Sequence, residues 1–404
     1  MRSIGTLVGC IVGGIAFGFG SSPIYAFQIV SFNGKFTRLE SPEAHYVVDS
    51  RGSDNFKNGC DGHGPCVSER EIIRVSFDAW ENVPGANVRF IEGEPKMMKN
   101  TGYDDTNSVV WVEKGWRELS FTPPSSALAV TISTYKTSNN EIVDSDIHFN
   151  GENFEWGSID SQEEENTHIV DIQNIATHEI GHFIGLDHSS ENMFEPEAKL
   201  YLATMFFASG PGETFRRNLG QDDTDATVNL YPEGDVSQPA IDSITPSQIN
   251  VQSAGAATIR IAGSGFLSNS TAMIATSNDG GDVVARIVSV SDNEMNVIFD
   301  LYGLPSGEYD VVVANSYDRM ERIEAGLLLT GGLGQVSDKT DANDEEFGTS
   351  SGSSSGGCRA SSSEHQAGLS LSGLFGLLLP LLLIGWVRFQ LGSQSQTERK
   401  RKNV

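Results

Sequence analysis

Basic residues are scarce in this chain, and the shortage limits the partners that it can have. Its 404 residues include 27 lysines and arginines against 54 aspartates and glutamates, which gives a net charge of −27. A chain with this charge repels other polyanions, which argues strongly against a nucleic-acid partner. Such a charge is typical of an exported protein that has to stay soluble, and it names no substrate.

Cysteine is also scarce, with four in the whole chain. Cys60 and Cys66 bracket a glycine-rich loop, Asp-Gly-His-Gly-Pro, and this spacing favours a disulfide in a compartment that permits one. The alternative is a small metal site made by both thiolates and His63, although the sequence offers no fourth ligand nearby.

Apolar side chains nearly disappear between residues 331 and 367, where glycine, serine and aspartate dominate, so a flexible linker is expected there. Residues 368–387 are the opposite, a nearly uncharged apolar run that is long enough for a transmembrane helix. The basic tail 388–404 is then expected in the cytoplasm. Together with Cys358, the run and the tail resemble the sorting signals of bacterial surface proteins, which implies cleavage or lipidation near Cys358.

The first 26 residues have the composition of a secretory signal peptide. Arg2 is followed by an apolar, glycine-rich run, by Ser21-Ser22-Pro23 and by a small residue, Ala26, near which we expect cleavage. A lipoprotein-type box ending at Cys10 is the alternative, but few apolar residues precede it. The chain is therefore expected to be exported and held at a membrane or cell surface.

The stretch from His178 to His188 has the spacing of a metal site, and it reads His-Glu-Ile-Gly-His-Phe-Ile-Gly-Leu-Asp-His. In a helix, His178 and His182 lie on one face and can bind one ion. Gly185 can end the helix in a left-handed conformation, so that His188 returns as a third ligand. Three imidazoles leave one position of a tetrahedral zinc open to water, as in catalytic sites. Glu179 is placed to take a proton from that water.

This pattern resembles the signature of the metzincin metalloproteases, in which a methionine turn follows the third histidine. Ser189 is similar to the residue that matrixins carry after that histidine, and Ala203-Thr204-Met205-Phe206 resembles the Met-turn. The resemblance implies that Met205 packs beneath the histidines without binding zinc. It also implies an α+β catalytic domain over residues 27–232, with a mixed twisted sheet, long helices, one catalytic Zn²⁺, and protein or peptide substrates.

Two further segments resemble the matrixins in part. Leu219–Asp225 and Leu230–Pro232 are similar to their closing helix, and residues 146–150 are similar to a segment with structural zinc and calcium ligands. The upstream strand lacks a second histidine, so His148 is expected to be an ordinary strand residue. Calcium is a candidate because hard oxygen ligands stand close together, although acidic loop residues are usually just solvated: Asp144, Asp146, Asn150 and Glu152.

The hydrophobic pattern places regular elements around the motif. It predicts a helix over 67–83 and strands over 44–49, 87–91, 108–112, 127–133 and 142–149. The motif helix should follow the polar run 161–167, with Asn166 or Thr167 as its cap. One face of that helix is apolar and another carries His178 and His182, so a packed element would hold the ligands.

Residues 238–330 contain short β-branched runs broken by glycine and asparagine, which predict an all-β sandwich. Ile244–Pro246, Ile261–Phe266 and Leu304–Tyr309 resemble IPT/TIG immunoglobulin-like modules. That resemblance implies a spacer or a surface for a partner.

The sequence therefore predicts an exported zinc-dependent endopeptidase with Glu179 as its general base. The alternative is a surface adhesion protein that uses the sandwich for contact and the zinc domain as a scaffold, but a scaffold needs no base. The Pro-Arg-Cys-Gly segment that keeps matrixins latent is missing. Any restraint of activity must come from elsewhere.

Overall fold

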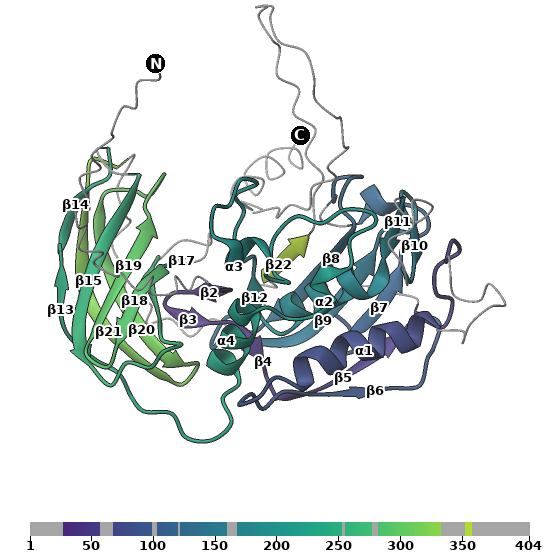
Figure 1. Cartoon of the computed structure of the whole chain (residues 1–404), viewed down its shortest axis with the longest axis horizontal. Coiled ribbons are helices and arrows are strands. Elements are labelled where there is room, and N and C mark those ends of the chain that lie inside the picture. Colours follow the sequence, from purple (N-terminus) through teal and green to yellow (C-terminus); the bar gives the residue numbers. More distant parts are fainter. Residues whose placement is uncertain are drawn as a thin grey trace, which may run out of the picture.

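The computed structural model describes residues 27–56, 68–98, 103–119, 122–159, 168–252, 255–276, 282–332 and the strand at 352–357. They form two parts that lie side by side, one built on a seven-stranded sheet with helices and one made of two further sheets (Figure 1). The predicted signal peptide, the Cys60–Cys66 loop, Cys358 and the run 368–387 lie outside these residues. Within the described ranges, no helix is both long and apolar enough to span a bilayer.

The large sheet is mixed, with strand order β22-β8-β9-β7-β5-β6 and β4 beside β9. Strands β4 to β7 and β9 pair in parallel, whereas β8 is antiparallel to both β9 and β22. All five strands predicted for this part are confirmed. The strands of the sheet are β4 (Arg38–Leu39), β5 (Glu43–Val48), β6 (Arg89–Glu92), β7 (Ser108–Trp111), β8 (Ala129–Tyr135), β9 (Glu141–Phe149) and β22 (Gly352–Gly357).

Two long helices, α1 (Glu69–Glu81) and α2 (Ile172–Phe183), cover one face of this sheet (Figure 1). The predicted helix over 67–83 is confirmed as α1. The predicted cap of α2 was wrong, because residues 169–171 first form an extended strand beside residues 155–157. Asp171 is the cap instead, and its carboxylate accepts a hydrogen bond from the Asn174 amide at 2.8 Å.

The helices are joined deep in the core by Trp80, which is fully buried and donates its indole N–H to the Thr177 carbonyl at 2.8 Å.

Shorter elements surround the large sheet and its two long helices. They are β1 (Gln28–Ile29), β2 (Ser31–Phe32), β3 (Lys35–Phe36), β10 (Glu155–Gly157), β11 (Ile169–Asp171), β12 (Leu186–Asp187), α3 (Ala198–Tyr201), α4 (Gln221–Leu230), and the 3₁₀ turns η1 (Trp116–Glu118) and η3 (Phe215–Arg217).

The second part is a β-sandwich, as predicted, and its two sheets enclose a common apolar core. One sheet has the order β13-β15-β19-β18 and the other β14-β21-β20-β16-β17. Its likeness to an immunoglobulin-like module stays a prediction. The strands are β13 (Ala240–Thr245), β14 (Gln248–Asn250), β15 (Ala256–Ser264), β16 (Thr271–Ala275), β17 (Val283–Val284), β18 (Arg286–Ser291), β19 (Glu294–Asp300), β20 (Gly307–Ser316) and β21 (Arg319–Thr330).

The sandwich packs directly on the α/β part. Apolar residues of β16 and β20, among them Met273 and Val312, belong to the same buried cluster as the core beneath α1 and α2. Asn229, near the end of α4, donates to the Asn269 carbonyl at 2.9 Å, and the Arg38 guanidinium lies 3.9 Å from the centre of the Tyr317 ring. The two parts are therefore joined by a buried interface.

The predicted linker over 331–367 includes residues 352–357. These residues form β22, which pairs with β8 at the edge of the large sheet. Strand pairing uses backbone groups, which every residue of this glycine- and serine-rich stretch carries, so a low content of apolar side chains does not prevent it.

Candidate active site

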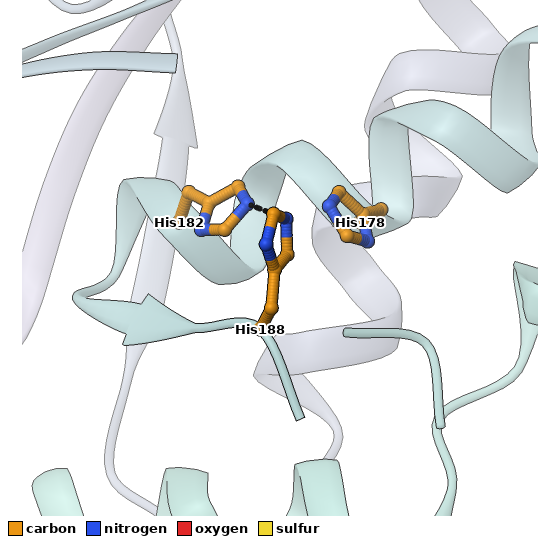
Figure 2. A group of neighbouring side chains, drawn as sticks. All are labelled: His178, His182 and His188. Atoms are coloured by element: carbon orange, nitrogen blue, oxygen red, sulfur yellow. Dashed lines mark hydrogen bonds between the residues drawn. The ribbon is translucent and has the colours of Figure 1, made fainter. Parts of the chain in front are cut away.

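Helix α2 and the short strand after it bring three histidines together. His178 and His182 lie one turn apart on α2, and His188 follows β12 (Figure 2). Gly185 makes the turn between them with φ 105°, and a Cβ atom built there would overlap with the Thr37 carbonyl oxygen. Only glycine fits this position, so the predicted helix-ending role of Gly185 is confirmed.

Each of the three rings has an acceptor at its Nδ1 atom. His178 Nδ1 lies 2.7 Å from the Thr204 carbonyl and His182 Nδ1 lies 2.9 Å from the Leu186 carbonyl. His188 Nδ1 lies 3.3 Å from a carboxylate oxygen of Glu191. A carbonyl or carboxylate oxygen accepts a hydrogen bond from Nδ1–H, and in the neutral ring this tautomer leaves Nε2 unprotonated.

The unprotonated nitrogens face one another. The possible ligand atoms of the three histidines lie within 4.8 Å of one another, and His182 Nε2 is 3.2 Å from His188 Nε2. His178 Nε2 is buried without a hydrogen-bond partner among the described residues. Tetrahedral zinc with bonds of about 2.0–2.1 Å separates its nitrogens by roughly 3.3 Å. The arrangement therefore fits one zinc ion held by three imidazoles.

Burial also sets the protonation state that a metal ligand needs. It lowers the pKa of His182 to about 3 and that of His178 well below its usual value, and the neighbouring histidines act in the same direction. Both rings are neutral at physiological pH, so no proton has to leave them before a metal binds.

The side chain of Glu179 is completely buried. The hydroxyl of Thr131, on β8, donates to its Oε2 atom at 2.6 Å and contacts its backbone carbonyl at 3.1 Å. This contact fixes the carboxylate against the sheet. Sequence reasoning missed Thr131, because no local signal links a strand residue to a helix residue so far along the chain.

Met205, the residue of the predicted Met-turn, packs beside α2. Met205 is 2% exposed, and a Cβ atom built at Gly181 would overlap with its sulfur, so the methionine packs directly against α2. The backbone amide of Ser189 donates to the Met205 carbonyl at 2.8 Å, which connects the turn to the residue after the third histidine.

The turn is held by Asp223 of α4. Its carboxylate accepts backbone hydrogen bonds from Thr204 at 2.7 Å, from Met205 at 3.0 Å and from Gly220 at 2.7 Å. Burial nevertheless raises the pKa of Asp223. The predicted closing segment thus contains the main support of the Met-turn, a role that its sequence did not reveal.

The predicted calcium ligands lie on β9 and in the turn that follows it. Among the described residues, the three histidines form the group of His, Cys, Asp and Glu side chains that is close enough to bind a metal. The carboxylates of Asp144, Asp146 and Glu152 accept backbone hydrogen bonds from Thr106, Ser108 and Trp116, and Asn150 donates to two backbone carbonyls. Calcium at these residues stays a prediction.

His148 alternates along β9 with Ile147 and Phe149, which belong to the core beneath α2, so it lies on the opposite face of the sheet. It is completely buried, and neither of its ring nitrogens has a hydrogen-bond partner within the described ranges. Burial lowers its pKa to about 4. The expectation that His148 is an ordinary strand residue agrees with this position.

The loop after His188 is tied to the sandwich. Glu195 has a fully buried side chain, which pairs with Arg286 of β18 at 3.2 Å and accepts a hydrogen bond from Ser190. Glu191 of the same loop contacts His188, so this loop connects His188 to the sandwich.

Comparisons with known proteins agree with this site. A family model described as Matrixin matches residues 67–232. Metalloendoproteinase 1 of Glycine max is 34% identical over 84 residues, which cover 21% of this chain and 24% of that protein. The chain thus spans about a quarter of the length of this relative. A crystal structure of a protein of unknown function from Bacteroides thetaiotaomicron aligns over 23% of this chain and 22% of that chain, with 9% identity and a TM-score of 0.19, too low for any argument.

The fold, the three histidines and these matches define a metallopeptidase-like part. More particularly, they support a matrixin-like zinc metalloprotease, with the α+β fold that the matrixin match implies.

Proposed function

We propose that the protein is an exported zinc-dependent endopeptidase that hydrolyses peptide bonds of extracellular or surface proteins, with Glu179 as general base. The observation that supports it most is the convergence of three Nε2 atoms at one point, next in sequence to a buried carboxylate. A structural zinc site would use four protein ligands, whereas three leave room for a reacting group.

Each residue of the site has its own role in the proposed reaction. His178, His182 and His188 would hold zinc, which would supply the Lewis acidity that polarises a carbonyl and acidifies water. Glu179 takes the proton from the attacking water and returns it to the leaving nitrogen. Thr131 restricts rotation of this carboxylate, so that little reorganisation is needed during the reaction.

The location is proposed from the sequence. The signal-like residues 1–26 support export, and the apolar run 368–387 with its basic tail supports a membrane anchor that leaves the catalytic part outside the cytoplasm. The sandwich is proposed to be an IPT/TIG-like module. Its buried contact with the α/β part means that it also stabilises the protease.

The test is Glu179→Gln in the full chain, with exposed Glu43→Gln as the matched control. Glu179→Gln should keep one equivalent of zinc and lower kcat by about 10²–10⁴-fold, the usual contribution of a general base. Glu43→Gln should change neither. Full activity of the zinc-loaded Glu179→Gln protein would exclude Glu179 as the general base. If neither the wild type nor the Glu43→Gln control cleaves any member of a peptide library, the proposed endopeptidase activity is excluded.

A further inference from the structure

Strand β22 occupies the edge of the large sheet that lies beside the proposed active site. It pairs antiparallel with β8 through six residue pairs, from Gly352 opposite Tyr135 to Gly357 opposite Val130. Figure 1 shows β22 as the yellow-green strand next to β8, and it also lies against α2. Without β22, β8 would be the outermost strand on this side.

The paired edge is connected to the catalytic carboxylate. Gly356 lies opposite Thr131 in the register, and Thr131 is the residue whose hydroxyl binds Glu179. An extended chain on β8 therefore runs past the point where peptide hydrolysis is proposed. An exposed strand edge is a template for extended peptides, because its backbone N–H and C=O groups pair with any sequence.

The composition of β22 predicts that it binds the β8 edge only weakly. Its sequence, Gly-Ser-Ser-Ser-Gly-Gly, has poor strand propensity and small side chains, so backbone pairing has to supply most of its binding. The segment belongs to the same chain as the edge, which gives it a high effective concentration there. The high local concentration lets β22 occupy the β8 edge. Because its pairing is weak, an extended substrate can displace it.

We propose that β22 is an intramolecular competitor that restrains the protease by covering the β8 edge, where an extended polypeptide substrate would pair. This rests on the proposed peptidase function. Competition at a binding edge raises KM and leaves kcat unchanged. It also gives a source of restraint to a chain without the cysteine-containing latency segment of the matrixins.

The test replaces Ser354 and Ser355 with proline in the full zinc-loaded chain. Successive residues of a strand direct their N–H groups to opposite sides, so two adjacent prolines remove at least one N–H from the pairing. The matched control is Ser361→Pro with Ser362→Pro, a change of the same chemistry outside β22. Thermal unfolding of both variants checks that the fold is kept.

The β22 variant should lower KM for an extended fluorogenic peptide about fivefold, as expected for loss of one backbone hydrogen bond, with kcat unchanged. The control should behave like wild type. A synthetic peptide covering residues 349–358 should inhibit the β22 variant competitively. Equal KM values for both variants, or a lower kcat for the β22 variant alone, would overturn the proposal.

Hydrogen exchange of the metal-free proteins separates this proposal from the proposed function. The β22 prolines should increase exchange of the β8 amides between residues 130 and 134, whereas the control prolines should not. If exchange is faster in the metal-free β22 variant but the zinc-loaded protein cleaves no peptide, the peptidase function is refuted and the edge contact is kept. Unchanged exchange together with normal cleavage would refute the edge contact alone.

Discussion

The two faces of the large sheet both bury histidine, but with different results. On the face covered by α2, three histidines have an acceptor at each Nδ1 and converge through Nε2. On the other face His148 is just as buried and neutral, but it stands alone with no hydrogen bond within the described part of the chain. Burial and a lowered pKa therefore do not make a metal site; convergence of oriented nitrogens does.

The comparison is tested most strongly by replacing one histidine on each face. His178→Ala should weaken zinc binding by more than about a hundredfold, since loss of partners behind the ligands already costs 10–100-fold. His148→Leu should bind zinc like wild type and keep or slightly raise the free energy of unfolding, because no unpaired ring nitrogen is then buried. Zinc titration and urea unfolding measure both, and a loss of zinc in His148→Leu would contradict the difference between the faces.

A second variant examines how the α2 face is supported. Asp223→Asn places an amide N–H₂ against backbone donors of the Met-turn, so we expect a loss of about 2–3 kcal/mol in the free energy of unfolding. Zinc affinity should fall as well, by about tenfold. Asp225→Asn, on the same helix and partly exposed, is the control. Equal unfolding curves for Asp223→Asn and Asp225→Asn would show that the Met-turn does not depend on the Asp223 carboxylate.

On the opposite face, Asp144 provides a pH-dependent effect. Burial, and next the charges of Asp146 and Asp104, raise the pKa of Asp144 to about 7. The folded state then binds a proton more tightly than the unfolded state, so stability should fall as pH rises from about 4 to about 7. Asp144→Asn should remove this fall and gain about 2 kcal/mol at pH 8 in the presence of a chelator.

If calcium binds at Asp144, it should stabilise the folded wild-type protein at high pH. Millimolar calcium would then raise the unfolding temperature of wild type at pH 8 and leave Asp144→Asn unchanged. The same response in both proteins would place any calcium elsewhere.

The smallest expected effect concerns the support that the α2 face receives from the sandwich. Arg286→Ala leaves the buried Glu195 carboxylate without its arginine and should cost about 1 kcal/mol, because Arg286 itself is 40% exposed. Arg260→Ala removes an exposed pair with Glu294 and should cost less than Arg286→Ala, because solvent screens an exposed pair. Unfolding of the two full-length variants under identical conditions measures the difference, and equal losses would mean that the interface pair adds nothing.

Local patterns predicted much of the α/β part. The helix α1, the five strands and the ligand turn at Gly185 follow from side-chain periodicity and backbone conformation, which neighbouring residues decide. The cap of α2 was missed because pairing with β10 keeps the chain extended up to Asp171, and strand pairing is not a local property. Strand β22 was missed for the same reason.

The sequence by itself predicted which residues could bind a metal, since helical spacing places His178 and His182 on one side and Gly185 returns His188 to them. Only the tertiary structure decided what holds them: Thr131 lies 48 positions from Glu179 along the chain, and Asp223 reaches the Met-turn from another helix. It also decided that the sandwich shares a core with the α/β part and that β22 lies on the β8 edge. Periodicity acts over one or two helical turns, whereas these contacts depend on how distant segments pack.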